Sequence, residues 1–153
     1  MKVGDGMIYD KKEKSSEETL KEQLEIAIDI MAHFHKGQRD KNNDVYMMHP
    51  LRIMLQMESH EEKIVAVLHD VLEDTKCNME YIMQKIDNKE IIDALYSITR
   101  KTDEKYFDYI RRVSKNKIAK EVKIKDLQDN LSRKGASQSL IRRYEKALKI
   151  LEG

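Results

Sequence analysis

The sequence predicts an all-α fold, a compact bundle of about eight helices. Helix-breaking residues are sparse, since the 153-residue chain has one proline, at position 50, and only five glycines. Helix-compatible Lys, Glu, Leu, Ile and Met are abundant. Apolar residues also recur at intervals of three and four, whereas no stretch alternates strongly with the two-residue period of a strand.

The first expected helix follows a polar N-terminal segment, residues 1–14. Ser15 and Glu18 have the spacing of a capping box, which predicts a helix start at this point. Gly37 is expected to end the helix, so His35 lies in its last turn, beside the apolar stripe. That stripe consists of Leu20, Leu24, Ala27, Met31 and Phe34.

A polar connection, residues 37–48, leads to a short helix that is expected to start at His49-Pro50, since proline is favoured in a first turn. The next helix is expected from about Glu61 to about Glu73. Residues 15–153 contain no internal repeat and are expected to form a single domain. Further helical patterns cover residues 78–86, 89–99, 103–114, 116–131 and 138–151.

Composition excludes several classes of protein. No apolar run approaches the roughly 20 residues of a membrane span, and residues 1–16 lack the apolar core of a signal peptide. Cys77 is the only cysteine, which excludes an internal disulfide and fits a reducing, cytoplasmic location. We therefore expect a cytoplasmic protein with no membrane partner.

The net charge of +1 conceals an asymmetry between the two parts of the chain. Residues 100–153 hold 16 Lys and Arg against 8 Asp and Glu, whereas residues 1–99 hold 13 against 20. A basic region can bind an anionic ligand such as a nucleotide or nucleic acid. It can also be a set of solvated helix faces, and charge alone favours this second interpretation.

The most informative stretch carries one imidazole and three carboxylates: His69, Asp70, Glu73 and Asp74. It directly follows the apolar run 64–68, which has the character of a buried helix. Burying such groups is costly unless they are paired or bind a metal. Residues four apart on a helix share a face, so the four side chains would form one patch. The stretch therefore predicts a metal-binding and proton-transferring site that needs further ligands.

Two other residues are candidates for completing the site. His35 lies near a helix C-terminus, where a histidine is also favoured simply by the helix dipole; His33, on a different face, is the alternative ligand. Asp126 shares an otherwise apolar stripe with Ala119 and Val122, so it needs either a metal or a neighbouring lysine as its partner.

Two imidazoles and two carboxylates, from His35, His69, Asp70 and Asp126, would suit Mn²⁺, Fe²⁺ or Zn²⁺. An ion of this kind lowers the pKa of bound water and polarises a phosphoryl oxygen. Glu73 and Asp74, farther along the same stretch, would then orient that water or transfer its proton.

Four motifs in order carry a resemblance to a known family. They are His35-Lys-Gly-Gln38, Tyr46-Met-Met-His49-Pro50-Leu51, Leu68-His69-Asp70-Val71-Leu72-Glu73-Asp74-Thr75, and Val122-Lys123-Ile124-Lys125-Asp126 with Asn130. Over about residues 20–150 the chain resembles the hydrolase domain of Rel/Spo-type alarmone enzymes, and above all their small stand-alone bacterial relatives. These are HD-domain metal-dependent phosphohydrolases, so the resemblance implies an HD-type helical fold.

The resemblance implies Mn²⁺-dependent hydrolysis of guanosine 3′,5′-bis(diphosphate) to GDP and pyrophosphate. Because His35, and not His33, precedes Lys-Gly-Gln, the resemblance selects His35 as the ligand. Water activation falls to Glu73 and Asp74, and a nucleotide contact to Asn130. The implied metal ligands are His35, His69, Asp70 and Asp126.

The chain departs from the family pattern at two places. The family's Arg-Lys-Ser-Gly-like loop is replaced by residues 37–43, in which Arg39 and Lys41 are shifted stand-ins for the family's cations. The family also has a basic residue shortly before the metal histidine, where this chain has residues 24–26, Leu-Glu-Ile. An alternative substrate is therefore another nucleotide, such as a phosphorylated adenine nucleotide.

Two more side chains complete the expected substrate contacts: Lys123 for a phosphate and Tyr144 for stacking on a base. Their ordinary alternatives are an exposed lysine and a packing tyrosine. His49 is expected to hold the loop or His35 through a hydrogen bond. The expected partner is a small-molecule nucleotide rather than nucleic acid. A non-catalytic module that binds nucleotide or nucleic acid through the basic C-terminal half is the alternative function.

Overall fold

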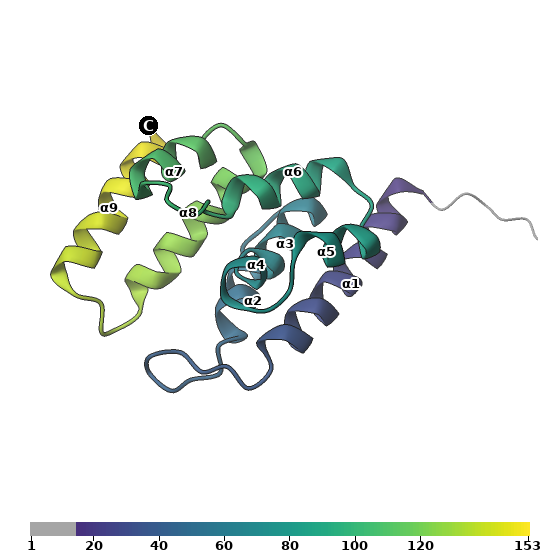
Figure 1. Cartoon of the computed structure of the whole chain (residues 1–153), viewed down its shortest axis with the longest axis horizontal. Coiled ribbons are helices and arrows are strands. Elements are labelled where there is room, and N and C mark those ends of the chain that lie inside the picture. The colour runs from purple at the N-terminus through teal and green to yellow at the C-terminus, as the bar shows by residue number, and fades with distance from the viewer. Residues whose placement is uncertain (1–14) are drawn as a thin grey trace, which may run out of the picture.

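A computed structural model describes residues 15–153, which contain nine helices and no strand beyond an isolated bridge between Arg39 and Val45 (Figure 1). The predicted all-α class is therefore confirmed. The polar segment predicted for residues 1–14 lies outside the described residues. Within the described part, no helix has both the length and the apolar character that crossing a membrane requires.

The first helix begins and ends where the sequence predicts. α1 (Ser16–His35) is capped by Ser15, whose side chain accepts a hydrogen bond from the backbone N–H of Glu18 at 3.1 Å. After its last residue the chain turns through Gly37, whose φ of +84° is a conformation that L side chains rarely adopt. His35 therefore lies at the very end of α1, where the chain leaves the helix for the 37–47 connection.

The helix predicted from Glu61 to Glu73 is wrong in one respect, because the structure divides it into α3 (His60–Leu68) and α4 (Val71–Asp74). The break falls at His69 and Asp70. The imidazole Nδ1 of His69 bonds to the backbone carbonyl of Ala66 at 2.6 Å. In a continuing helix that carbonyl would accept from the N–H of residue 70. The His69 side chain thus bonds to a carbonyl that the backbone would use in a longer helix, and α3 ends at this point.

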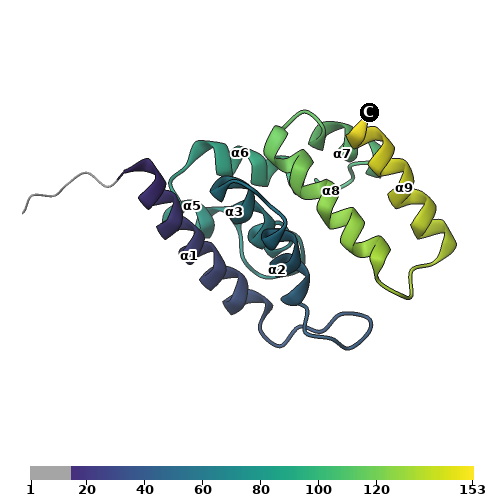
Figure 2. The same ribbon diagram turned by 180° about the vertical axis from the view of Figure 1, so that it is seen from behind.

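α3 forms the centre of the bundle. Its residues 64–68 are fully buried, and it contacts α1, α2, α6 and α8. Figures 1 and 2 show α1 on one side of α3, and the antiparallel pair α8 and α9, with α7, on the other. The remaining helices are α2 (Met48–Leu55), α5 (Met79–Lys85), α6 (Lys89–Ile98), α7 (Tyr106–Val113), α8 (Lys117–Ser132) and α9 (Gln138–Glu152).

Candidate metal centre

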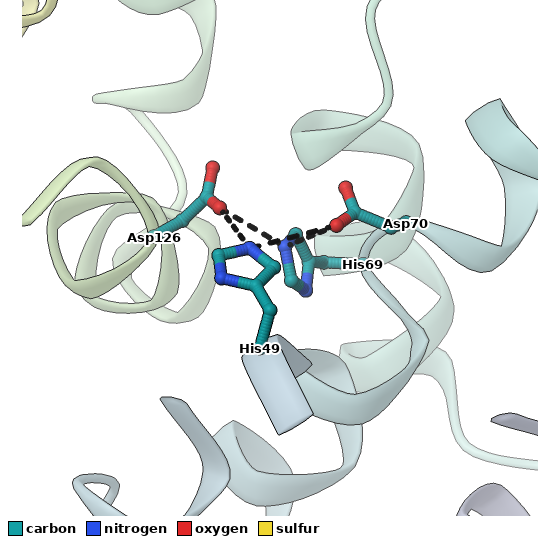
Figure 3. Close-up of side chains that lie close together, drawn as sticks. All are labelled: His49, His69, Asp70 and Asp126. Atoms are coloured by element: carbon teal, nitrogen blue, oxygen red, sulfur yellow. Dashed lines mark hydrogen bonds and ion pairs between the residues drawn. The ribbon is translucent and has the colours of Figure 1, made fainter. Parts of the chain in front are cut away.

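The C-terminal end of α3 meets α2 and α8 at four side chains, His49, His69, Asp70 and Asp126, here called the metal group (Figure 3). One ligand atom from each lies within 4.8 Å of those of the other three. Three of the four are predicted ligands, and they come together from separate parts of the chain. The fourth position in this group is taken by His49, whereas His35 is not a member.

The separations within the metal group fit a divalent cation. Nε2 of His69 lies 3.1 Å from Oδ2 of Asp70 and 3.2 Å from Oδ1 of Asp126. Nε2 of His49 lies 2.8 Å from the same Asp126 oxygen and 3.7 Å from Oδ2 of Asp70. Two ligand atoms that are each about 2.1 Å from one ion stand about 3.0–3.4 Å apart. The two His69 separations match this spacing, and the two His49 separations lie just outside it on either side.

Three imidazoles are anchored in the same way, through Nδ1. Nδ1 of His69 bonds to the Ala66 carbonyl at 2.6 Å, and Nδ1 of His49 to Oδ2 of Asp129 at 2.6 Å. Nδ1 of His35 bonds to Oε1 of Gln38 at 2.8 Å. Each bond to an acceptor oxygen favours the hydrogen on Nδ1 and leaves Nε2 as the coordinating nitrogen. This is the usual arrangement around histidines that bind metals.

His35 is fully buried, and its Nε2 has no hydrogen-bond partner within residues 15–153. Its ring lies 4.9 Å from that of Tyr46, whose hydroxyl donates a hydrogen bond to Asp70. Buried polar atoms without partners are uncommon and need an explanation. A metal ligand beside the metal group is one, so His35 remains the predicted ligand. His33 instead packs edge-on against Phe34.

The protein's own charges keep the carboxylates of the metal group ionised. Burial alone would raise the pKa of Asp126, but the Lys123 ammonium, 2.7 Å from its Oδ2, and the imidazoles of His69 and His49 hold that pKa well below its usual range. Burial disfavours the charged form of His69, yet Asp70 and Asp126 raise its pKa well above the ordinary value. Positive charge is therefore strongly favoured between the two carboxylates, as a proton or as a cation.

Glu73 and Asp74, the predicted proton-transferring residues, lie outside the metal group. Oε1 of Glu73 accepts from the backbone N–H of Arg100 at 2.6 Å, and Oδ2 of Asp74 accepts from the Tyr46 hydroxyl at 3.3 Å. Burial is the main cause that raises the pKa of both carboxyls, and the charge of Asp70 adds to it. Carboxyls with raised pKa values are suited to general acid–base chemistry.

Four of the five predicted substrate contacts line one cavity of about 290 Å³. Gln38, which anchors His35, and Tyr46, which bonds to Asp70, also line it, so the cavity adjoins the metal group. A larger cavity, of about 880 Å³, contains none of the predicted site residues. The predicted residues lining the smaller cavity are Arg39, Lys41, Asn130 and Tyr144.

Lys123 is placed differently from the other predicted contacts. Its side chain is only 15% exposed, its ammonium bonds to Asp126, and it does not line the cavity. Both interpretations of Asp126 therefore hold in part: it pairs with a neighbouring lysine, as the simpler alternative expected, and it also belongs to the metal group. The structure gives Lys123 the role of a buried partner for a ligand carboxylate.

The sequence interpretation missed two residues around the metal group. Asp129 bonds to His49, which also bonds to Asp126, whereas the sequence interpretation expected His49 to hold the loop or His35. Arg52 in turn bonds to Asp129. The available signal was the spacing of three between His49 and Arg52 and between Asp126 and Asp129, which places each pair on one helix face.

Comparison with known proteins gives both sequence and fold relatives. No family model matches the chain. The guanosine-3′,5′-bis(diphosphate) 3′-pyrophosphohydrolase of Borreliella burgdorferi is 30% identical over 96 residues, which cover 57% of this chain and 14% of that protein. A protein of the same name from Aquifex aeolicus is 32% identical over 72 residues, which cover 44% of this chain and 10% of the relative. The chain thus matches a small part of each relative.

A solved structure of a metazoan ortholog of SpoT, which hydrolyzes ppGpp, superposes with a TM-score of 0.67 and 21% identity. The match covers 86% of each chain. This chain has the same fold. The predicted resemblance to a Rel/Spo-type hydrolase domain is confirmed by the two sequence relatives and by this fold.

Proposed function

We propose that this protein is a metal-dependent nucleotide phosphohydrolase that hydrolyses guanosine 3′,5′-bis(diphosphate) to GDP and pyrophosphate. The observation that carries the proposal is the metal group, buried beside a cavity that presents Arg39, Lys41, Asn130 and Tyr144. The names of the two sequence relatives and the activity of the SpoT ortholog support this substrate. Such an enzyme would lower the alarmone level of the stringent response in the cytoplasm.

The residues that would hold the ion are His35, His69, Asp70 and Asp126, with His49 beside them. Mixed nitrogen and oxygen ligands fit Mn²⁺, Fe²⁺ or Zn²⁺, and the family resemblance favours Mn²⁺. When bound, such an ion makes water more acidic and polarises a phosphoryl oxygen.

Glu73 and Asp74 direct the attacking water and receive its proton. The Arg100 N–H binds Oε1 of Glu73 and thereby fixes the carboxyl, so the other oxygen is the one open for this task. Tyr46 fixes Asp74 in a similar way. Because burial raises the pKa of both carboxyls, each accepts a proton more readily than an exposed carboxylate.

The cavity binds the nucleotide as a small-molecule substrate. Its volume, about 290 Å³, lies near the lower end of typical ligand sites. Arg39 and Lys41 neutralise phosphate charge, which is the main requirement of phosphoryl transfer. Asn130 supplies an amide for hydrogen bonding, and the Tyr144 ring offers a surface on which a base can stack.

The test is product analysis after the purified protein is incubated with guanosine tetraphosphate and Mn²⁺. Equal amounts of GDP and pyrophosphate are expected, with no product when EDTA is present. A parallel panel of 3′- and 2′-phosphorylated adenine nucleotides tests the base, because residues 24–26 lack the cation that the family has near this point. Turnover of an adenine nucleotide alone would show that this nucleotide, and not guanosine tetraphosphate, is the substrate. Absence of turnover for every nucleotide tested would contradict the proposed hydrolysis.

A further inference from the structure

We propose that Asp129, clamped by Arg52, is a positioning residue that turns Nε2 of His49 into the metal group, where His49 acts as an additional ligand of the ion. The inference rests on the metal dependence of the proposed function. The family resemblance implies four ligands, and the inference adds His49 to them. It also adds Asp129 and Arg52, the two residues that hold His49 in place.

The first step is the fixed orientation of Asp129. Nε of Arg52 lies 2.9 Å from Oδ1 of Asp129, and Nη2 lies 2.9 Å from Oδ2. Two parallel bonds between a guanidinium and a carboxylate fix the plane of the carboxylate as well as its position. Asp129, paired with the guanidinium of Arg52, is thus a carboxylate with a defined orientation.

The second step is the orientation of the His49 ring. Oδ2 of Asp129 lies 2.6 Å from Nδ1 of His49, and both residues are under 10% exposed. An ionised carboxylate can only accept a hydrogen bond, so Nδ1 carries the hydrogen. The opposite nitrogen, Nε2, then points between the carboxylates of Asp126 and Asp70, at 2.8 and 3.7 Å (Figure 3).

The third step is the equivalence of His49 and His69. Nε2 of His69 lies between the same two carboxylates, at 3.1 and 3.2 Å. Each ring is held from behind by an oxygen atom, that of Ala66 for His69 and that of Asp129 for His49. A nitrogen lone pair and a carboxylate oxygen repel each other unless a proton or cation lies between them. His49 therefore meets the same geometric conditions as His69, which is a predicted ligand.

Helix packing explains how two helices bring this arrangement about. His49 and Arg52 are three residues apart on α2, and Asp126 and Asp129 are three residues apart on α8. The two helices are in contact, so one face of α2 meets one face of α8. The outer pair, Arg52 and Asp129, is an ion pair, and the inner pair joins the metal group.

The test measures Mn²⁺ binding without nucleotide, by following free Mn²⁺ with electron paramagnetic resonance in the wild type and in Asp129→Asn. The substitution preserves size but weakens the anchor of His49. We expect Mn²⁺ affinity to fall about 10- to 100-fold, as for other partners of metal-binding histidines. The matched control is Asp108→Asn, which removes an exposed carboxylate paired with Arg111 and should leave affinity unchanged.

A second variant, His49→Gln, tests coordination directly and keeps the inference testable if Asp129→Asn does not fold. With ¹⁵N-labelled histidine, electron spin echo measurements on bound Mn²⁺ should detect one fewer coordinated nitrogen than in the wild type. An unchanged nitrogen count, or an unchanged affinity of folded Asp129→Asn, would overturn the inference and leave the proposed function intact. Wild-type protein that binds none of Mn²⁺, Fe²⁺ and Zn²⁺ would overturn both.

Discussion

The metal group and the environment of Arg112 are two clusters of charge that are satisfied in different ways. Arg112 donates to both carboxylate oxygens of Glu104, at 2.8 Å each. It also donates to the backbone carbonyls of Tyr96, Ser97 and Thr99. All three guanidinium nitrogens have partners, so this cluster is complete and joins the end of α6 to α7.

The surroundings of the metal group differ, because a buried nitrogen beside it has no partner within the described residues. Asp126 pairs with the ammonium of Lys123 and Asp70 accepts from the Tyr46 hydroxyl, while the Nε2 atoms of two imidazoles converge on both carboxylates. Beside it, Nε2 of His35 is buried without a partner. Polar networks that only hold a fold are normally satisfied internally. The difference favours a purely structural role for the Arg112 cluster and supports the ligand-binding role proposed for the metal group.

Asp126→Ala should disrupt the metal group most strongly. The change removes a carboxylate that both imidazoles face and leaves the ammonium of Lys123 buried without its partner. We expect loss of both Mn²⁺ binding and nucleotide hydrolysis, measured by calorimetric titration and product release. The same losses are expected for Asp70→Ala. Full turnover in either purified variant would show that these residues do not hold a required ion.

Glu73→Gln should separate proton transfer from metal binding. The amide oxygen can still accept from the Arg100 N–H, so the fold and the Mn²⁺ affinity should be retained. We expect kcat to fall about 10²- to 10⁴-fold, the usual contribution of a general acid or base. Steady-state kinetics with a parallel Mn²⁺ titration provides the measurement. Wild-type kcat in this variant would remove Glu73 from the proton-transfer step.

Tyr144→Ala should act on the cavity without changing the metal group. Loss of a stacking surface for one base is expected to weaken substrate binding by about 1–3 kcal/mol, or roughly 5- to 150-fold in KM. Mn²⁺ affinity should stay at the wild-type value. An unchanged KM would favour the simpler interpretation of Tyr144 as a packing residue. Comparison of guanine and adenine substrates in the same assay shows whether the lost contact depends on the base.

Glu104→Gln should have the smallest effect and should change only the stability of the folded protein. The hydrogen bonds from Arg112 outweigh burial and lower the pKa of Glu104 to about 2. Because the folded-state pKa is depressed, the stabilisation is present above the ordinary pKa and is lost as pH falls toward 2. We expect a Tm about 2–4 °C below wild type at pH 7, with the gap closing below pH 4. Mn²⁺ affinity equal to that of the wild type is the accompanying control.

Local sequence signals were sufficient for most helices and for part of the site. Ser15 and Glu18 located the start of α1, and the apolar stripe around Asp126 predicted that this carboxylate is buried. The break between α3 and α4 at His69 was missed because it involves a bond between a side chain and the backbone. Such a bond does not alter the spacing of apolar residues along the sequence. Periodicity alone continues the helix through that point.

The features missed at the site depend on which helices face each other. The position of His49 in the metal group requires the contact between α2 and α8, and nothing local to residues 48–55 specifies that contact. Lys123 was expected either to contact a phosphate or to be an ordinary exposed lysine, whereas it is only 15% exposed. Its partner, Asp126, lies three residues along the same helix, and this pairing was one of the two alternatives that the sequence offered for Asp126.

The position of α3 has a consequence for how this chain can diverge. His69 and Asp70 directly follow the fully buried residues 64–68, so changes that shift the centre of the core also shift two predicted metal ligands. The cavity is built instead from the connection 37–47, the end of α8 and α9, largely away from that centre. Under the proposed function, substitutions there would change which nucleotide is accepted at little structural cost. The fold thus separates the constrained residues of the metal group from a cavity whose lining is free to vary.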